Sequence, residues 1–144
     1  MNLFNLRSLD TDVCSEYGVQ EFLNPKNPTD FTDFRQRIID KINQWLDNKH
    51  SQNLLYAVCI RQMDAWVLTL FANQNDKDTA KISKPKYDLG FVKEYKKLAS
   101  KPIPERYNKL SDNFSKKKKL KEAIKYNQSL KDFVNSLENY FGAL

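Results

Sequence analysis

Two aspartates separated by one residue, Asp10 and Asp12, have the type and spacing that suit metal chemistry. They come directly after "NLFNLRSL", an apolar segment that predicts a strand over residues 2–9. Carboxylate oxygens at a strand end are ligands that magnesium and manganese prefer. Such an ion activates water or stabilises a leaving phosphate oxygen. The alternative interpretation is an ordinary turn, because turns are rich in aspartate.

A run of lysines is the second chemical feature. Its members are Lys116, Lys117, Lys118, Lys119, Lys121 and Lys125. Residues 76–144 hold 17 Lys/Arg against 9 Asp/Glu, a net charge of +8, whereas residues 1–75 hold 7 against 9, a net charge of −2. This asymmetry predicts an anionic partner, most often nucleic acid, bound in a salt-dependent and sequence-indifferent way. The alternatives are a solvated lysine face and a protein partner or larger complex.

Three aromatic residues, Tyr107, Phe114 and Tyr126, lie near this run. If they are exposed, they can stack on single-stranded bases. If they are buried, they belong to the core and only the lysines face a partner.

Arg61 and Asp64 interrupt the least polar stretch of the chain, "LYAVCIRQMDAWVLTLF". One interpretation is a local ion pair at the rim of the core, with Trp66 as a core anchor. In the other, Arg61 lies at the carboxyl end of a strand, where open α/β sheets bind ligands, and faces a phosphate. Asp64 then orients it or joins Asp10 and Asp12 around a cation.

Several catalytic classes are excluded by composition. The chain has one histidine, His50, so a histidine-based triad or a multi-histidine metal site is not expected. Its three glycines form no phosphate-binding loop. Cys59 falls in the apolar stretch and is expected to be a small buried hydrophobe. The catalytic residues are therefore not identified, and whether the chain is an enzyme stays open.

The periodicity of apolar residues predicts one α/β domain spanning residues 1–144: a small parallel sheet covered by helices, with a helix-rich C-terminal half. The strands are expected at 2–9 and 54–60, because Tyr56, Ala57 and Ile60 leave no polar face for a helix. The principal helices are expected at 30–47, 61–73 and 127–141, with a further helix in "LGFVKEYKKLAS", a short one in "PERYNKLSDNF", and one capped by Ser115. The helix at 30–47 has apolar residues at spacings of three and four, among them Phe31, Phe34, Ile38 and Trp45, which are expected to face the core. Gly142 is placed to end the last helix. The alternative is an all-α bundle in which residues 54–71 form one helix.

Three segments together resemble an uncharacterised Toprim-like family related to overcoming-lysogenization-defect nucleases. The segments are "LRSLDTDVCSEYGVQEFL", "YAVCIRQMDAWVLTLFA" and "KKLKEAIKYNQSLKDFVNSLENY", over roughly residues 3–140. The resemblance implies a nucleic-acid-processing or nucleic-acid-binding protein, of a defence or mobile-element system, with magnesium or manganese on Asp10 and Asp12. A Toprim site also has a glutamate on a preceding strand, and this chain has none before Asp10. The resemblance therefore implies a degenerate nuclease, or one completed by another subunit.

The second functional hypothesis is a non-catalytic, mostly helical subunit that binds nucleic acid or a partner protein through its basic C-terminal half. The chain opens without a charged-then-apolar leader, and no uninterrupted apolar run reaches the roughly 18 residues of a membrane span. A cytoplasmic location, away from membranes, is the expectation.

Overall fold

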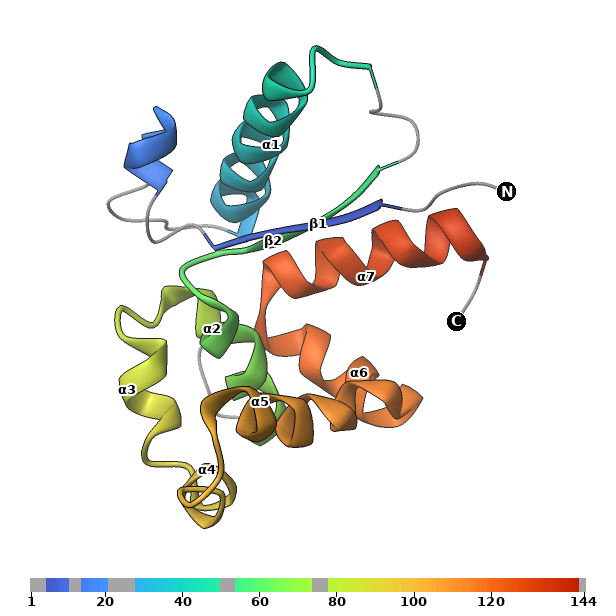
Figure 1. The fold of residues 1–144 in the computed structure, drawn as a ribbon. Helices are drawn as coiled ribbons and strands as arrows, with labels where there is room; N and C mark the ends of the chain where they lie inside the picture. The colour runs from blue at the N-terminus through green and yellow to red at the C-terminus, as the bar shows by residue number, and fades with distance from the viewer. Residues whose placement is uncertain (1–4, 11–13, 21–27, 50–53, 74–77, 143–144) are drawn as a thin grey trace.

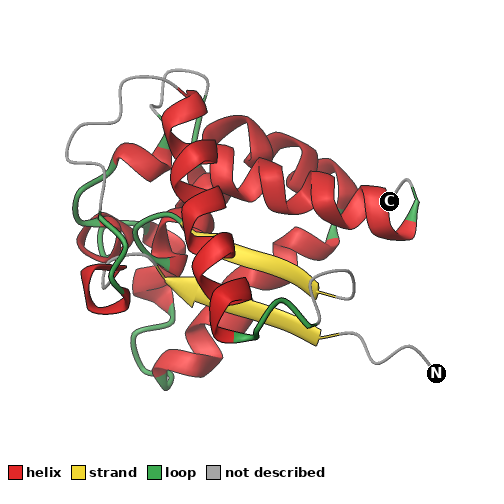
Figure 2. Cartoon of the chain, turned by 90° about the horizontal axis from the view of Figure 1, so that it is seen from above, coloured by secondary structure: helices red, strands yellow, loops and turns green. Residues whose placement is uncertain are grey.

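The fold is mostly helical and contains a small parallel sheet. The computed structural model describes residues 5–10, 14–20, 28–49, 54–73 and 78–142. Within these residues the strands are β1 (Asn5–Asp10) and β2 (Leu54–Cys59), which pair in parallel. Figures 1 and 2 show the two strands side by side among the helices. The α/β prediction therefore holds in part: the helices dominate, and the sheet is limited to two strands.

Seven α-helices account for most of the described chain. They are α1 (Pro28–Trp45), α2 (Met63–Leu68), α3 (Pro85–Leu89), α4 (Lys93–Lys97), α5 (Ile103–Ser111), α6 (Lys117–Ala123) and α7 (Gln128–Phe141). Short 3-10 helices occupy Cys14–Tyr17, Thr69–Phe71, Thr79–Lys81, Asp112–Ser115 and Ile124–Tyr126. In Figure 1, α1 lies on one side of the sheet and α7 on the other, and α2 to α6 lie on the same side as α7. None of the described helices has the length and apolar character needed to cross a membrane.

Strand β2 is buried along its whole length. Successive side chains of a strand point to opposite faces, and β2 shows this alternation. Leu54, Tyr56 and Val58 belong to the core cluster that contains the apolar face of α1. Ala57 and Cys59 belong to the cluster formed with Trp66 and α7. The absence of polar residues in "LLYAVC" is thus the consequence of a strand covered on both faces.

Residues 54–71 form a strand followed by a helix, as predicted, because the backbone turns between β2 and α2. Arg61 adopts φ 71°, a left-handed conformation that cannot continue an α-helix. The helix is shorter than the predicted 61–73, because α2 ends at Leu68 and a 3-10 turn continues it to Phe71.

Helix α1 packs a stripe of buried apolar residues against the sheet, but its last residue is more exposed than expected. Phe31, Phe34 and Ile38 are among its buried residues, at the predicted spacing. Trp45, expected in the core, is 51% exposed and touches Tyr17 edge-to-face with ring centroids 5.5 Å apart. It is the last residue of α1, at the point where the chain turns away from the core.

Two boundaries in the second half were predicted incorrectly. The helix expected in "LGFVKEYKKLAS" is shortened to α4, because the chain turns at Gly90–Val92, and α3 ends at Leu89, the first residue of that segment. The N-cap of α6 is Lys116 and not Ser115, whose hydroxyl donates instead to the carbonyl of Asp112 at 2.6 Å. In contrast, Gly142 ends α7 in a left-handed conformation, as expected.

A buried cation fixes α1 against the sheet. Arg35 is 9% exposed, and its Nη2 donates to the backbone oxygen of Tyr56 in β2 at 3.0 Å. Burial lowers the pKa of Arg35, and the nearby carboxylate of Asp132 in α7 acts in the opposite direction. Asp132 in turn accepts a hydrogen bond from Thr32 of α1 at 3.0 Å. These contacts join α1, β2 and α7.

Candidate nucleic-acid interface

The carboxyl ends of the two strands lie together, as a metal or phosphate site would require. The backbone of Asp10 ends β1 opposite Cys59, the last residue of β2. Arg61 follows two residues later, half-buried and in the left-handed conformation. A non-glycine residue in this conformation costs about 1 kcal/mol or more, and such strain concentrates at functional sites. Arg61 follows the carboxyl end of a strand, as predicted, and its contact with a phosphate stays a prediction.

The structure leaves the predicted metal site without a test. Asp12 and His50 lie outside the described residues, and of Asp10 only the backbone position is described. Among the residues that the structure does describe, no group of three or more His, Cys, Asp or Glu side chains could hold a metal ion. Two aspartates alone would leave much of the octahedral coordination of magnesium to water. Magnesium or manganese on Asp10 and Asp12 stays a prediction.

Asp64 faces the helical half of the molecule. It is 7% exposed and accepts a hydrogen bond from the hydroxyl of Tyr107 in α5. This is the contact that the structure records for Asp64, in place of the predicted ion pair with Arg61. Asp64 therefore connects α2 to α5. Trp66 is 5% exposed and is a core anchor, as expected.

A buried chain of hydrogen bonds joins α2 to the start of α7. Trp66 Nε1 donates to Ser129 Oγ at 2.8 Å, and Ser129 Oγ donates to Asn127 Oδ1 at 2.8 Å. Asn127 Nδ2 donates to Thr79 Oγ1 at 2.9 Å, which donates to the backbone oxygen of Ala65 at 2.7 Å. The four side chains are at most 5% exposed. Their polar groups are satisfied by one another, which is the arrangement of a structural network.

The lysine run extends along α6 and onto the residues at its two ends. All six predicted lysines are exposed: Lys116, Lys117, Lys118, Lys119, Lys121 and Lys125. The opposite side of the helix holds Leu120, Ala123 and Ile124, which pack in the cluster around Trp66. Because a helix turns about 100° per residue, the consecutive lysines spread over the remaining arc. The result is a broad positive surface and not a narrow stripe.

Two of these lysines make local contacts. Lys125 Nζ lies 2.8 Å from Glu122 Oε1, and this hydrogen bond lowers the pKa of Glu122 and raises that of Lys125. Lys116 Nζ donates to Asn113 Oδ1 at 3.4 Å. The six ammonium groups are thus accessible, but the charge of Lys125 is partly neutralised by the carboxylate of Glu122.

The aromatic residues expected beside the lysines are partly buried. Phe114 packs against the Trp66 cluster and Tyr107 bonds to Asp64. Tyr126 is half-buried, and its backbone oxygen accepts a hydrogen bond from Thr79 at 3.2 Å. This favours the interpretation in which these three aromatics serve the core and only the lysines face a partner.

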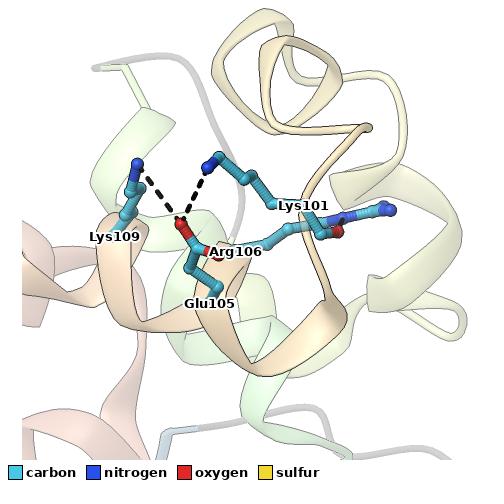
Figure 3. A network of polar contacts seen from close by, with 4 residues as sticks. All are labelled: Lys101, Glu105, Arg106 and Lys109. Atoms are coloured by element: carbon cyan, nitrogen blue, oxygen red, sulfur yellow. Dashed lines mark hydrogen bonds and ion pairs between the residues drawn. The ribbon is translucent and has the colours of Figure 1, made fainter.

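Another group of basic residues, on α5 and just before it, forms ion pairs and hydrogen bonds within the protein. Glu105 lies 3.3 Å from Lys101 Nζ and 3.6 Å from Lys109 Nζ (Figure 3). The hydrogen bond from Lys101 is the main cause of the lowered pKa of Glu105. Arg106 donates to the backbone oxygens of Lys101 and Ala99 at 2.7 and 2.6 Å. These side chains fasten the α4–α5 connection.

A second basic surface was missed from the sequence. Tyr87 and Phe91 are 63% and 61% exposed, among exposed lysines on α3 and α4. Tyr87 also lines a hollow of about 390 Å³ with Gln62, Ser83, Lys84 and Lys86. The signal was present as two aromatics four residues apart in "KPKYDLGFVKEYKK", but only a helix in "LGFVKEYKKLAS" was predicted there, and no binding surface.

Another hollow of the described structure is apolar. It has a volume of about 510 Å³ and lies among α2, α5, α6 and α7 beside β2. Trp66, Phe133 and Leu137 are among its lining residues, with Asn108 and Ser111 as its main polar groups. It offers no cluster of titratable groups for catalysis.

Comparison of the chain with protein-family models, with curated proteins and with solved structures finds no match.

Proposed function

We propose that this protein binds nucleic acid through its basic, helical second half. The observation that carries the proposal is the exposure of all six lysines on α6 and at its two ends, while Leu120, Ala123 and Ile124 pack in the core. A cluster of ammonium groups neutralises phosphates and releases their counterions, which gives binding that depends on salt and little on sequence. The net charge of +8 on residues 76–144 attracts a polyanion to the same half of the molecule.

The structural role of the neighbouring polar residues supports a binding function without catalysis. Asp64 bonds to Tyr107, and the Trp66–Ser129–Asn127–Thr79 chain is buried. These groups are engaged in packing helices together. The proposal is therefore a helical nucleic-acid-binding protein, acting alone or as a subunit of a larger complex.

A second candidate function is a Toprim-like, metal-dependent nuclease of a defence or mobile-element system, in degenerate or incomplete form. The observation that favours it is the parallel pairing of β1 with β2, which brings the backbone of Asp10 close to the strand end that leads into Arg61. In this function Asp10 and Asp12 bind magnesium or manganese, and Arg61 contacts a phosphate.

One assay tests the proposal and separates the two candidates. The protein is mixed with labelled single- and double-stranded DNA and RNA over a series of salt concentrations, with and without magnesium or manganese. Binding that weakens linearly in log affinity against log salt, without cleavage, is the result expected for the proposal. Cleavage that needs the metal supports the second candidate. No binding at low salt to any of the four nucleic acids contradicts both.

A further inference from the structure

We infer that the surface formed by Tyr87, Phe91 and the lysines around them binds single-stranded nucleic acid, with bases stacked on the two aromatic rings. We call it the aromatic surface. Its lysines are Lys84, Lys86, Lys93, Lys96 and Lys97. The inference rests on the proposed function and adds to it a separate site, away from α6, with a preference for single strands.

The two rings are exposed without serving the core. Tyr87 and Phe91 are 63% and 61% exposed, whereas Leu89 between them is fully buried against α2 and α5 residues. Leaving two aromatic rings in water forgoes the stabilisation that their burial would give. Exposed aromatics of this kind indicate a binding surface when they occur together.

The rings of Tyr87 and Phe91 meet edge to face and not as a parallel stack. The centroids of Tyr87 and Phe91 are 4.9 Å apart and their planes meet at 73°, an edge-to-face contact. Such a contact does not cover the rings as a parallel stack would. Lys96 Nζ lies over the ring of Phe91, 5.4 Å from its centroid, so a base that stacks on that face takes the place of the ammonium group.

The positive charge of the aromatic surface favours an anionic partner. Residues 81–97 contain six lysines against two acidic residues, Asp88 and Glu94, a net charge of +4. Lysine is depleted in the cores of protein–protein interfaces. Aromatic rings within a positively charged groove are the combination that binds single strands, since every base can stack and every phosphate can be neutralised. In a duplex the base faces are stacked on one another, so they cannot stack on the rings of Tyr87 and Phe91.

A recess extends the surface toward the sheet. The hollow of about 390 Å³ is lined by Tyr87, Lys84, Lys86, Ser83 and Gln62. Gln62 directly follows Arg61, so the recess adjoins the turn between β2 and α2. A strand of nucleic acid that stacks on Tyr87 can therefore place a phosphate or base in this recess. In Figure 1, α3 and α4 lie at the opposite end of the molecule from α1.

The test compares two similar pairs of aromatics. Tyr140 and Phe141 at the end of α7 are also exposed and edge-to-face, with centroids 5.0 Å apart. The variants are Tyr87→Ala with Phe91→Ala, and Tyr140→Ala with Phe141→Ala as the matched control. Binding to a labelled oligothymidine and to a duplex of the same length is measured by fluorescence anisotropy, and circular dichroism checks the fold.

We expect the first variant to lose roughly 5- to 150-fold in affinity for the single strand per ring that stacks. Its duplex affinity should be unchanged, and the slope of log affinity against log salt should be retained, because no lysine is removed. The control pair should bind as the parent does. Tyr87→Trp with Phe91→Trp should keep single-strand binding, since indole also stacks on bases. A merely structural role of Tyr87 and Phe91 would not predict that binding is kept.

Three results would overturn the inference. If the parent binds single strands and the Tyr87→Ala, Phe91→Ala variant binds them equally well, the aromatic surface is not the site, while the proposed function stands. If the parent binds no nucleic acid, both fall. If the parent sediments as a dimer that this variant converts to a monomer, the occupant of the surface is a second copy of the chain.

Discussion

The hydroxyl of Tyr107 donates a hydrogen bond to the carboxylate of Asp64, 43 residues earlier, and thereby joins α5 to the first turn of α2. Asp64 is 7% exposed, so its carboxylate depends on protein donors in place of water. Tyr107→Phe should lower the free energy of unfolding by about 1.5–3 kcal/mol, the range for hydrogen bonds to charged groups. Urea denaturation followed by tryptophan fluorescence measures this loss.

Tyr87→Phe is the matched control, because it removes a hydroxyl from a ring that is 63% exposed. Its effect should lie within about 0.5 kcal/mol of zero. Equal stability of the Tyr107→Phe and Tyr87→Phe variants would show that the contact with Asp64 contributes nothing.

Asn127 combines two structural roles, and its loss should be among the most costly changes to a polar residue. Its Oδ1 caps α7 by accepting from the backbone N–H of Leu130 at 3.0 Å and also accepts from Ser129 at 2.8 Å. Asn127→Ala removes the cap and leaves buried donors without a partner, so we expect a loss of about 2–4 kcal/mol. Asn135→Ala, on an exposed position of the same helix, is the control and should change stability by less than about 1 kcal/mol. Similar midpoints in urea for the two variants would contradict the role of the buried network.

Asp78 should make stability depend on pH in the acidic range. Burial raises its pKa above the usual 3.8, although the backbone N–H of Ala80 donates to it at 2.8 Å and, with Lys81, opposes the shift. The folded state thus holds the proton more tightly than the unfolded chain, so the contribution of Asp78 to stability falls as pH rises from about 3.8 through the raised pKa and then stays level. Asp78→Asn keeps an oxygen acceptor for Ala80 and removes the titration. The free energy of unfolding of the variant minus that of the parent should therefore increase with pH in this window.

Urea denaturation of both proteins between about pH 3.5 and 7 provides the comparison. The raised pKa of Asp78 is contradicted if the difference in the free energy of unfolding between the two proteins is the same at every pH.

Much of the fold was predictable from the sequence because burial imposes a period on apolar residues. The alternation of Tyr56, Ala57 and Val58 between two core clusters is the physical reason that "LLYAVC" has no polar face, and this is what favoured a strand over a helix. The stripe of α1 was predictable for the same reason, except at Trp45, where the helix ends. Gly142 was recognised as a stop because a left-handed residue favours glycine.

Other features depend on contacts between distant segments, which no local pattern reveals. The partner of Asp64 is 43 residues away, whereas the predicted partner Arg61 was three residues away. Tyr87 and Phe91 have the four-residue spacing of a buried helical face, but α3 ends at Leu89 and both rings are exposed. Of the candidate site, the exposure of the lysine run was predictable, since consecutive lysines cannot all be buried.

Magnesium or manganese binding, if Asp10 and Asp12 form a site, should be weak, because two carboxylates supply a minority of the six ligands. Isothermal calorimetry of the parent is compared with Asp10→Asn with Asp12→Asn, which should abolish the heat of binding. Asp88→Asn with Asp112→Asn removes two exposed carboxylates elsewhere and should leave the heat unchanged. Identical titrations of the parent and the Asp10, Asp12 variant would remove the metal site from the account.

The central claim is that the lysines of α6 neutralise phosphates, and replacing four of them tests it. Changing Lys116, Lys117, Lys118 and Lys119 together to glutamine should weaken binding to DNA and RNA about equally across sequences. The fold should survive, because the side chains are exposed and their mutual repulsion at the positive end of a helix is relieved. Changing the same four to arginine keeps the charge and should keep the affinity. Lys41→Gln with Lys49→Gln, on the acidic half, controls for charge removed elsewhere.

The most direct measurement is the slope of log affinity against log salt for the parent and the four-glutamine variant. The account predicts that the slope becomes shallower by up to roughly 0.9 per lost phosphate contact on duplex, or roughly 0.7 on single strands. An unchanged affinity and an unchanged slope would contradict it, and would reduce the lysine run to a solubilising face.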